Sequence, residues 1–293
     1  MDISELQAFV SVAEHGSFSR AAQALYLTQP AISKRIARLE SELGEALFDR
    51  LGRQHIQLTE AGRALLPHAR ATLHRLDDGL RAIQQLSNEV SGRLRLGTSH
   101  HIGLHHLPPI LRRYHEHYPE VELDLRFMGS EQACRQVEQG KLEIALVTLP
   151  NRPPPSLRQQ AIWNDPLAVV VAPTHPLAQK QKLRPRHLCA YPAILPERNT
   201  YTRELLENAL PQDASLTVSL ATNYLEIIRM MVSVGLGWSV LPLTLVNEEL
   251  KPLHVEGIEL ARQLGVVQHR QRTLSNAALA MLSFLAERSQ DRR

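Results

Sequence analysis

A run of polar and basic residues from Gln29 to Arg38 has the types and spacing that suit contact with nucleic acid. At ~100° per residue, a helix here would present Pro30, Lys34 and Arg38 outward, with Ser33 on the flank and Gln29 at the exposed end. Its inward stripe would be Ile32, Ile36 and Leu39. No acidic residue occurs between Ser17 and Leu39. Such a face can bond to base edges and phosphates in a DNA major groove, although an ordinary amphipathic helix shows the same pattern.

A second group of polar residues follows the predicted strands or precedes the predicted helices of the C-terminal two thirds of the chain. Its members are Thr98, Ser99, His100, His101, Ser130, Thr148, Thr200, Thr202 and Asn223. Small ligands of open α/β sheets bind at the carboxyl ends of strands, against helix N-termini that favour negative charge. Taken singly, most of these residues are better explained as helix caps. Their concentration predicts a site for a small effector, preferably an anion.

Histidines and cysteines offer weaker signals. His100, His101, His105, His106, His115 and His117 lie within 18 residues, and the i, i+4 pair His101 and His105 could hold a metal. No cysteine or carboxylate joins them at a recognisable spacing, so we expect no metal site. Cys134 and Cys189 could form a redox pair, but two inert, buried thiols are the preferred interpretation. Two cysteines in a chain of this size indicate a reducing compartment.

The elements around Gln29–Arg38 predict a winged helix-turn-helix over residues 1–60. Ser17 or Ser19 can cap a first short helix, and Thr28 can cap the second, with Pro30 in its first turn. After Gly44, the run FDRLGRQHIQLT alternates on both sides of Leu51-Gly52-Arg53, which predicts a β-hairpin. Arg53 at the tip of this wing could enter a minor groove.

Residues 61–90 predict a long linker helix with one narrow apolar seam. The seam positions are Leu66, Ala69, Leu73, Leu76, Leu80, Ile83 and Val90, at alternating spacings of three and four apart from one polar slot at Ser87. The residues between them are mostly polar, so we expect the seam to pair with a second copy of the chain. The alternative is packing against the core of its own domain.

Residues 91–293 alternate strands and helices, which predicts an α/β domain with a mostly parallel sheet. The expected strands are 93–98, 121–127, 143–148, 167–172, 215–221, 238–242 and 264–269. The expected helices are 103–118, 130–139, 202–209, 223–234 and 276–288. Strand 121–127 alternates apolar and charged residues, which is typical of an edge strand or of a strand that faces a partner.

The run SFSRAAQALYLTQPAISKRIARLESELGEALFDRLGRQHIQLTEAGRALL resembles the DNA-binding domain of LysR-type transcriptional regulators, and the layout of the remaining chain is similar to that family as well. The resemblance implies DNA contacts at Gln29, Pro30, Ser33, Lys34 and Arg53. It implies effector contacts at Ser99, His101, Ser130, Thr148 and Thr200. It also implies antiparallel pairing of linker helices, a tetramer, and two Rossmann-like subdomains resembling a periplasmic binding protein, with RNA polymerase as a further partner.

We therefore expect an α+β multidomain regulator that binds double-stranded promoter DNA. The assigned DNA-binding residues are Ser19, Arg20, Thr28, Gln29, Pro30, Ser33, Lys34, Arg38 and Arg53. The assigned dimerisation residues are Leu66, Leu73, Leu76, Leu80 and Ile83. Subdomain I is expected over 91–161 and 268–293 and subdomain II over 162–267, with crossings near 161–164 and 265–269.

The remaining expectations concern what the protein lacks. The sequence carries no catalytic motif, so no catalytic residue, metal or cofactor is expected. It also carries no secretory signal and no apolar run of membrane-spanning length, which predicts a cytoplasmic protein. The alternative is a solute-binding or metabolic enzyme α/β domain with an accessory helix-turn-helix. The absence of catalytic motifs and of a signal peptide counts against it.

Overall fold

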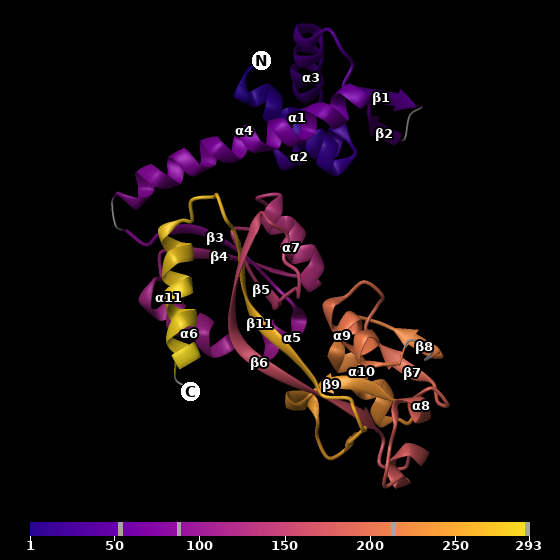
Figure 1. The fold of residues 1–293 in the computed structure, drawn as a ribbon. Coiled ribbons are helices and arrows are strands. Elements are labelled where there is room, and N and C mark those ends of the chain that lie inside the picture. Colours follow the sequence, from indigo (N-terminus) through magenta and orange to yellow (C-terminus); the bar gives the residue numbers. More distant parts are fainter. Residues whose placement is uncertain (52–54, 87–88, 212–214, 291–293) are drawn as a thin grey trace. The chain divides into compact units, whose positions relative to one another are not determined.

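Residue contacts divide the chain into two compact units, Met1–Ser87 and Asn88–Arg293. The computed structural model (Figure 1) describes the whole sequence except residues 52–54, 87–88, 212–214 and 291–293. None of the described helices is long and apolar enough to cross a membrane.

The N-terminal unit is a winged helix-turn-helix, as predicted. Its elements are α1 (Ile3–His15), α2 (Phe18–Ala24), α3 (Gln29–Leu43), β1 (Phe48–Leu51), β2 (His55–Leu58) and α4 (Glu60–Gln85). Ile32, Ile36 and Leu39 of α3 are fully buried against α1 and α2, so the predicted apolar stripe is confirmed. Strands β1 and β2 pair antiparallel, but Arg53 lies outside the described residues.

Local hydrogen bonds fix the ends of these helices. Ser17, and not Ser19, caps α2 by accepting a hydrogen bond from the Arg20 N–H. Thr28 caps α3 in the same way through the Ala31 N–H, as predicted. Gly44 ends α3 with a φ of 72°, a left-handed conformation that costs a glycine nothing. The two caps leave a tight turn, residues 25–28, between α2 and α3.

Helix α4 lies in two different environments along its length. Leu66, Ala69 and Leu73 pack against the core of the N-terminal unit, which is the alternative considered for this seam. Leu76, Leu80 and Ile83 are exposed in the single chain. The prediction was wrong for Val90, because α4 ends at Gln85 and Val90 packs against a core of the C-terminal unit.

The C-terminal unit contains two groups of hydrophobic cores joined by two long strands. Subdomain I is built from β3 (Gly92–Thr98), α5 (His100–His105), α6 (Pro108–His117), β4 (Val121–Phe127), α7 (Ser130–Glu138), β5 (Ile144–Thr148) and α11 (Asn276–Gln290). Subdomain II is built from η1 (Pro176–Gln179), α8 (Pro185–Leu188), β7 (Ala193–Leu195), α9 (Tyr201–Ala209), β8 (Val218–Ala221), α10 (Leu225–Ser233), β9 (Ser239–Pro242), η2 (Leu243–Leu245) and β10 (Lys251–Leu253). Strands β6 (Leu157–Val171) and β11 (Leu260–His269) run through both (Figure 1).

The order of the main sheet is β10-β6-β11-β5-β3-β4, with β9 also paired to β6. β4 is at the edge, as its alternating sequence predicted. On one face, α6 and α11 pack over apolar residues of β3 and β5, and α7 packs on the opposite face. This arrangement places the ends of β3 and β5 beside the starts of α5 and α7.

Three expectations for this unit were wrong. The sheet is mixed, because β6 and β11 run antiparallel to each other and β11 runs antiparallel to β5. The helix expected over 103–118 is two helices, since the chain turns at Leu107 before two prolines. The return crossing occurs before Leu264 and not within 265–269, because Leu264 to Gln268 already pair with β5.

Candidate nucleic-acid interface and small-molecule pocket

The outward face of α3 carries the polar groups predicted from sequence. Gln29, Pro30, Lys34 and Arg38 are exposed and Ser33 is half-buried. Gln29 Nε2 donates a 3.1 Å hydrogen bond to Ser33 Oγ, so these two side chains already lie in mutual reach. The amide of Gln29 and the hydroxyl of Ser33 can form hydrogen bonds to base edges, and Lys34 can pair with a phosphate.

Two of the predicted contact residues have roles within the fold. Arg38 Nε lies 3.1 Å from Glu5 Oε1, and the Glu5 side chain is almost completely buried. Thr28 is occupied as the cap of α3. Ser19 and Arg20 of α2 are exposed. Tyr26, in the turn before α3, is 97% exposed and was not singled out from the sequence.

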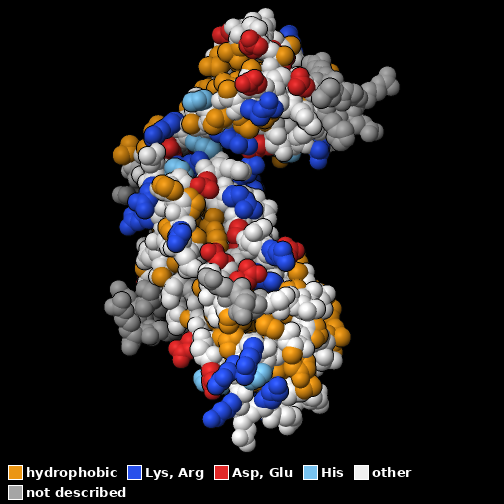
Figure 2. All heavy atoms as spheres, turned by 45° about the vertical axis from the view of Figure 1, so that its right-hand side comes forward, with side chains coloured by type: hydrophobic (Ala, Val, Ile, Leu, Met, Phe, Trp, Pro, Cys, Tyr) orange, Lys and Arg blue, Asp and Glu red, His pale blue; other side chains and the backbone are white. Residues whose placement is uncertain are grey.

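Net charge does not mark the N-terminal unit as a surface for DNA. Residues 1–90 carry 10 Lys and Arg against 11 Asp and Glu. On the face drawn in Figure 2, basic and acidic side chains are interspersed over both units. Non-specific attraction to phosphates is correspondingly weak, which leaves more of the recognition to the geometry of α3.

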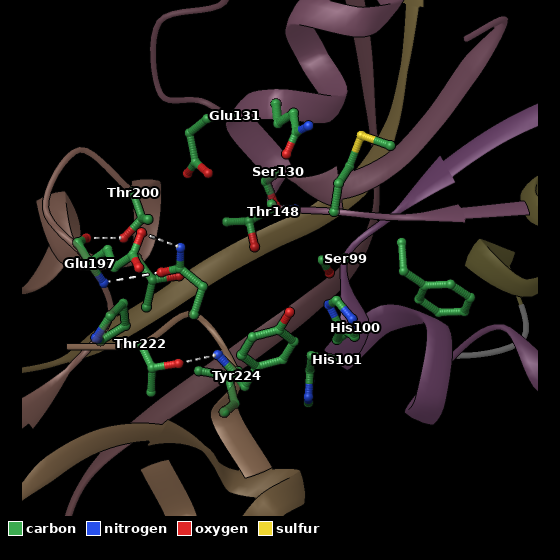
Figure 3. A pocket seen from close by; sticks show the side chains of 18 of the residues that line it. Ser99, His100, His101, Ser130, Glu131, Thr148, Glu197, Thr200, Thr222 and Tyr224 are labelled. Atoms are coloured by element: carbon green, nitrogen blue, oxygen red, sulfur yellow. Dashed lines mark hydrogen bonds between the residues drawn. The ribbon is translucent and has the colours of Figure 1, made fainter. Parts of the chain in front are cut away.

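A pocket of about 410 Å³ lies in the C-terminal unit between the ends of β3 and β5 and the starts of α7, α9 and α10. Eight of the nine predicted effector residues line it, namely Ser99, His100, His101, Ser130, Thr148, Thr200, Thr202 and Asn223. Thr98 does not, because its side chain is buried at the end of β3. Figure 3 shows Ser99 and His100 on one side of the pocket and Glu197 and Thr200 on the other.

Several of these hydroxyls already form hydrogen bonds within the protein. Ser99 caps α5, and Thr200 caps α9 while donating to the carbonyl oxygen of Glu197. Ser130 Oγ accepts a 3.1 Å hydrogen bond from the backbone N–H of Thr148. The Thr148 hydroxyl, by contrast, neither donates a hydrogen bond to another residue of the described part of the chain nor accepts one from it. It is therefore the hydroxyl most available to a ligand.

A buried arginine lines the same pocket and was missed from the sequence. Arg262 Nε donates a 2.7 Å hydrogen bond to Asp165 Oδ2, and Nη1 donates a 3.0 Å hydrogen bond to Thr202 Oγ1. Arg262 Nη2 is buried and has no hydrogen-bond partner among the described residues. An unpaired guanidinium N–H in a buried setting favours an acceptor, above all an anionic one.

Two carboxylates, also missed from the sequence, line the pocket. Glu131 on α7 accepts a 2.7 Å hydrogen bond from the backbone N–H of Tyr201. Glu197 Oε2 accepts a 3.0 Å hydrogen bond from Asn223 Nδ2. The pocket therefore contains acceptors that suit ligand hydroxyl or ammonium groups, as well as the donor on Arg262.

The histidines that line the pocket and the two cysteines of the chain differ in character. Burial and the nearby Arg262 charge lower the pKa of His101 to about 3, so its imidazole is neutral at pH 7. His100 packs edge-on against Tyr224, with ring centroids 4.7 Å apart. Cys134 and Cys189 are both free, and burial raises the pKa of the Cys134 thiol to about 11.

Comparisons with known proteins identify the family of each part of the chain. The family described as "LysR substrate binding domain" matches residues 87–290, and "Bacterial regulatory helix-turn-helix protein, lysR family" matches residues 3–63. The chain is 30% identical over 291 residues to a probable RuBisCO transcriptional regulator of Synechocystis sp., covering 96% of this chain and 84% of that protein.

Two solved structures share the fold. A full-length OxyR variant from Pseudomonas aeruginosa matches with a TM-score of 0.74 and 23% identity, over 99% of this chain and 95% of that chain. Full-length CbnR complexed with its target DNA matches with a TM-score of 0.63 and 18% identity, over 98% of this chain and all of that chain. Since the two family matches together cover most of its length, the chain belongs to the LysR family of transcriptional regulators.

Proposed function

We propose that this LysR-type regulator binds promoter DNA as a dimer or higher oligomer, and that a small organic anion in the pocket modulates that binding. The recognition groups are Gln29, Ser33 and Lys34 on the exposed face of α3. The exposed end of the seam, from Leu76 to Ile83, supplies apolar side chains for pairing with a second copy. The DNA-bound oligomer then acts on transcription together with RNA polymerase.

The observation that carries the ligand proposal is that Arg262, whose buried Nη2 has no hydrogen-bond partner among the described residues, lines the same pocket as Thr148. A carboxylate or similar group would satisfy both donors. Helix N-termini at α5, α7 and α9 favour the same charge, because the aligned peptide dipoles of a helix place partial positive charge at its N-terminus.

The carboxylates refine the ligand class. A simple dianion would be repelled by Glu131 and Glu197, both of which line the pocket. A small monocarboxylic acid with hydroxyl or amino groups would bond to Arg262 and Thr148 at one end and to the glutamates at the other. We therefore propose a hydroxy acid or amino acid in preference to an unsubstituted diacid.

Ligand binding contacts residues of both subdomains, so it favours one arrangement of the hinge formed by β6 and β11. A change in the hinge would in turn change the spacing between the DNA-binding units of the paired chains. Ligand binding and DNA binding are then coupled because each favours one arrangement of the hinge over the other.

The test begins with a thermal-shift screen of the full chain against hydroxy acids, amino acids and unsubstituted diacids. A ligand at 100 times its Kd stabilises the folded state by about 2.7 kcal/mol, which such a screen detects. Calorimetry then compares Thr148→Val with Thr244→Val, an exposed threonine on η2 outside the pocket. We expect a loss of about 1–3 kcal/mol for Thr148→Val and none for the control. Equal affinities for all three proteins would contradict the proposed site.

A further inference from the structure

Three potential metal ligands from different parts of the chain meet beside the pocket. His101 and His105 lie one turn apart on α5, with ring centroids 4.9 Å apart. Glu226, in the first turn of α10, places Oε1 3.1 Å from His105 Nε2, across 121 residues of sequence. One ligand atom from each of the three lies within 4.8 Å of the others. The sequence showed the histidine pair but gave no sign of this carboxylate.

The burial of the His101 side chain is not explained by hydrogen bonds within the protein. Its side chain is only 3% exposed, yet neither ring nitrogen has a hydrogen-bond partner among the described residues. Leaving buried polar nitrogens unpaired costs about 1–3 kcal/mol. A metal ion bound to a ring nitrogen would give His101 the polar partner that it lacks in the described part of the chain.

The set of side chains has the composition of a known class of zinc ligands. Two histidines at i, i+4 on one helix face, with a carboxylate from another element, make a His₂Glu set. Zinc sites of this composition keep a fourth position open for water or another ligand. His105 and Glu226 are each about one-third exposed, at 34% and 32%, so an ion can reach them from solvent.

A second triad, His101, His106 and Asp165, shares His101 but suits a cation less well. Asp165 already accepts a 2.7 Å hydrogen bond from Arg262. A metal ion there would have to face the guanidinium charge and compete for the same oxygen. Glu226 makes no ion pair with an arginine or lysine among the described residues, and its contact is the His105 ring.

We propose that His101, His105 and Glu226 form a binding site for a divalent transition-metal ion of the zinc type. His101 and His105 belong to subdomain I and Glu226 belongs to subdomain II. The ion therefore links α5 to α10 and holds the two subdomains together beside the pocket. On the proposed function, metal binding would therefore favour one arrangement of the same hinge on which the small-molecule ligand acts.

The test uses full-length protein freed of metal with a chelator and then dialysed. Zn²⁺ affinity is measured by competition with a chromophoric chelator, and Co²⁺ is added separately because its visible absorption reports ligand geometry. The variants are His105→Gln and Glu226→Gln, both at partly exposed positions. The matched control is His115→Gln, an exposed histidine on α6 outside the triad. Thermal unfolding without metal checks that every variant folds.

We expect the parent and His115→Gln to bind one Zn²⁺ per chain with the same affinity. Each triad variant should bind at least tenfold more weakly and should lose the Co²⁺ absorption, because removing a ligand leaves the ion with two protein donors. Equal Zn²⁺ affinity in the parent and both triad variants would show that the ion sits elsewhere among the 14 histidines. That result, or no stoichiometric binding by the parent, would overturn the proposal.

Discussion

The backbone N–H of Tyr201 donates a 2.7 Å hydrogen bond to Oε1 of Glu131, joining α9 of subdomain II to α7 of subdomain I. Tyr201 is the first residue of α9, so the carboxylate lies where the helix dipole favours negative charge. The protein itself thus supplies an anion at a position that a ligand carboxylate could otherwise take. This contact links the two subdomains, so we expect it to stabilise one arrangement of the proposed hinge.

Replacing that anion should change both stability and ligand affinity. We expect Glu131→Gln to lower the free energy of unfolding by about 0.3–2 kcal/mol, because a neutral amide interacts less with the α9 N-terminus. The same change should raise the affinity for an unsubstituted diacid, since it removes a negative charge that repels such a ligand from the pocket lining. Urea denaturation and calorimetry measure the two effects. Glu120→Gln, at an exposed glutamate before β4, is the control. A parent-like response of Glu131→Gln in both measurements would contradict this role.

The face of α3 should read base sequence rather than charge alone. We expect Gln29→Ala and Ser33→Ala each to lower affinity for the specific DNA site by about 1–3 kcal/mol and to leave binding to scrambled DNA nearly unchanged. Because the two side chains are hydrogen-bonded to each other, the double variant should lose less than the sum of the single losses. Gel-shift titrations on both duplexes measure this, with Ser41→Ala, an exposed position near the C-terminal end of α3, as control. Equal losses on specific and scrambled DNA would exclude base readout.

The exposed part of the α4 seam should hold two copies of the chain together. Leu80→Asp combined with Ile83→Asp places charges that a helix–helix interface cannot desolvate. We expect the DNase footprint to shorten toward half-sites while the N-terminal unit stays folded, because both side chains are exposed in the single chain. Ala71→Asp, on the opposite face of α4, should leave the footprint unchanged. A full-length footprint from the double variant would mean that this seam is not the pairing surface.

Cys134 should be a poor redox sensor. With a pKa near 11, about one thiol in a thousand is ionised at pH 8, and only the thiolate is reactive. We expect slow alkylation by iodoacetamide in the native protein, rising with pH and becoming fast after denaturation. Mass spectrometry of the Cys134 peptide measures the rate. Rapid native alkylation, or a disulfide to Cys189 after mild peroxide treatment, would contradict the buried, inert state.

The features predicted from sequence were those fixed by local chemistry. The cap at Thr28, the apolar stripe of Ile32 and Ile36 and the edge position of β4 all follow from nearby residues. Hydroxyls such as Ser99 and Thr148 were found because strand ends are visible in the sequence and converge in α/β folds.

The features that were missed depend on residues far apart in the chain. Arg262 meets Asp165 across 97 residues, and Glu131 meets Tyr201 across 70. Neither pair has a spacing that a local pattern could reveal. Val90 was placed on the α4 seam because its spacing continued the heptads. The helix instead ends at Gln85, and the Val90 side chain packs against a core of the C-terminal unit.

The central claim is that a ligand in this pocket changes DNA binding, and Thr148→Val tests it most directly. DNA affinity is measured by gel shift over a range of concentrations of the acid found in the thermal-shift screen, for the parent, Thr148→Val and Thr244→Val. We predict equal DNA affinities without ligand for all three. The ligand response of Thr148→Val alone should then require about 5- to 150-fold more ligand, in proportion to its lost affinity. A response of Thr148→Val at the same ligand concentration as the parent would contradict the account.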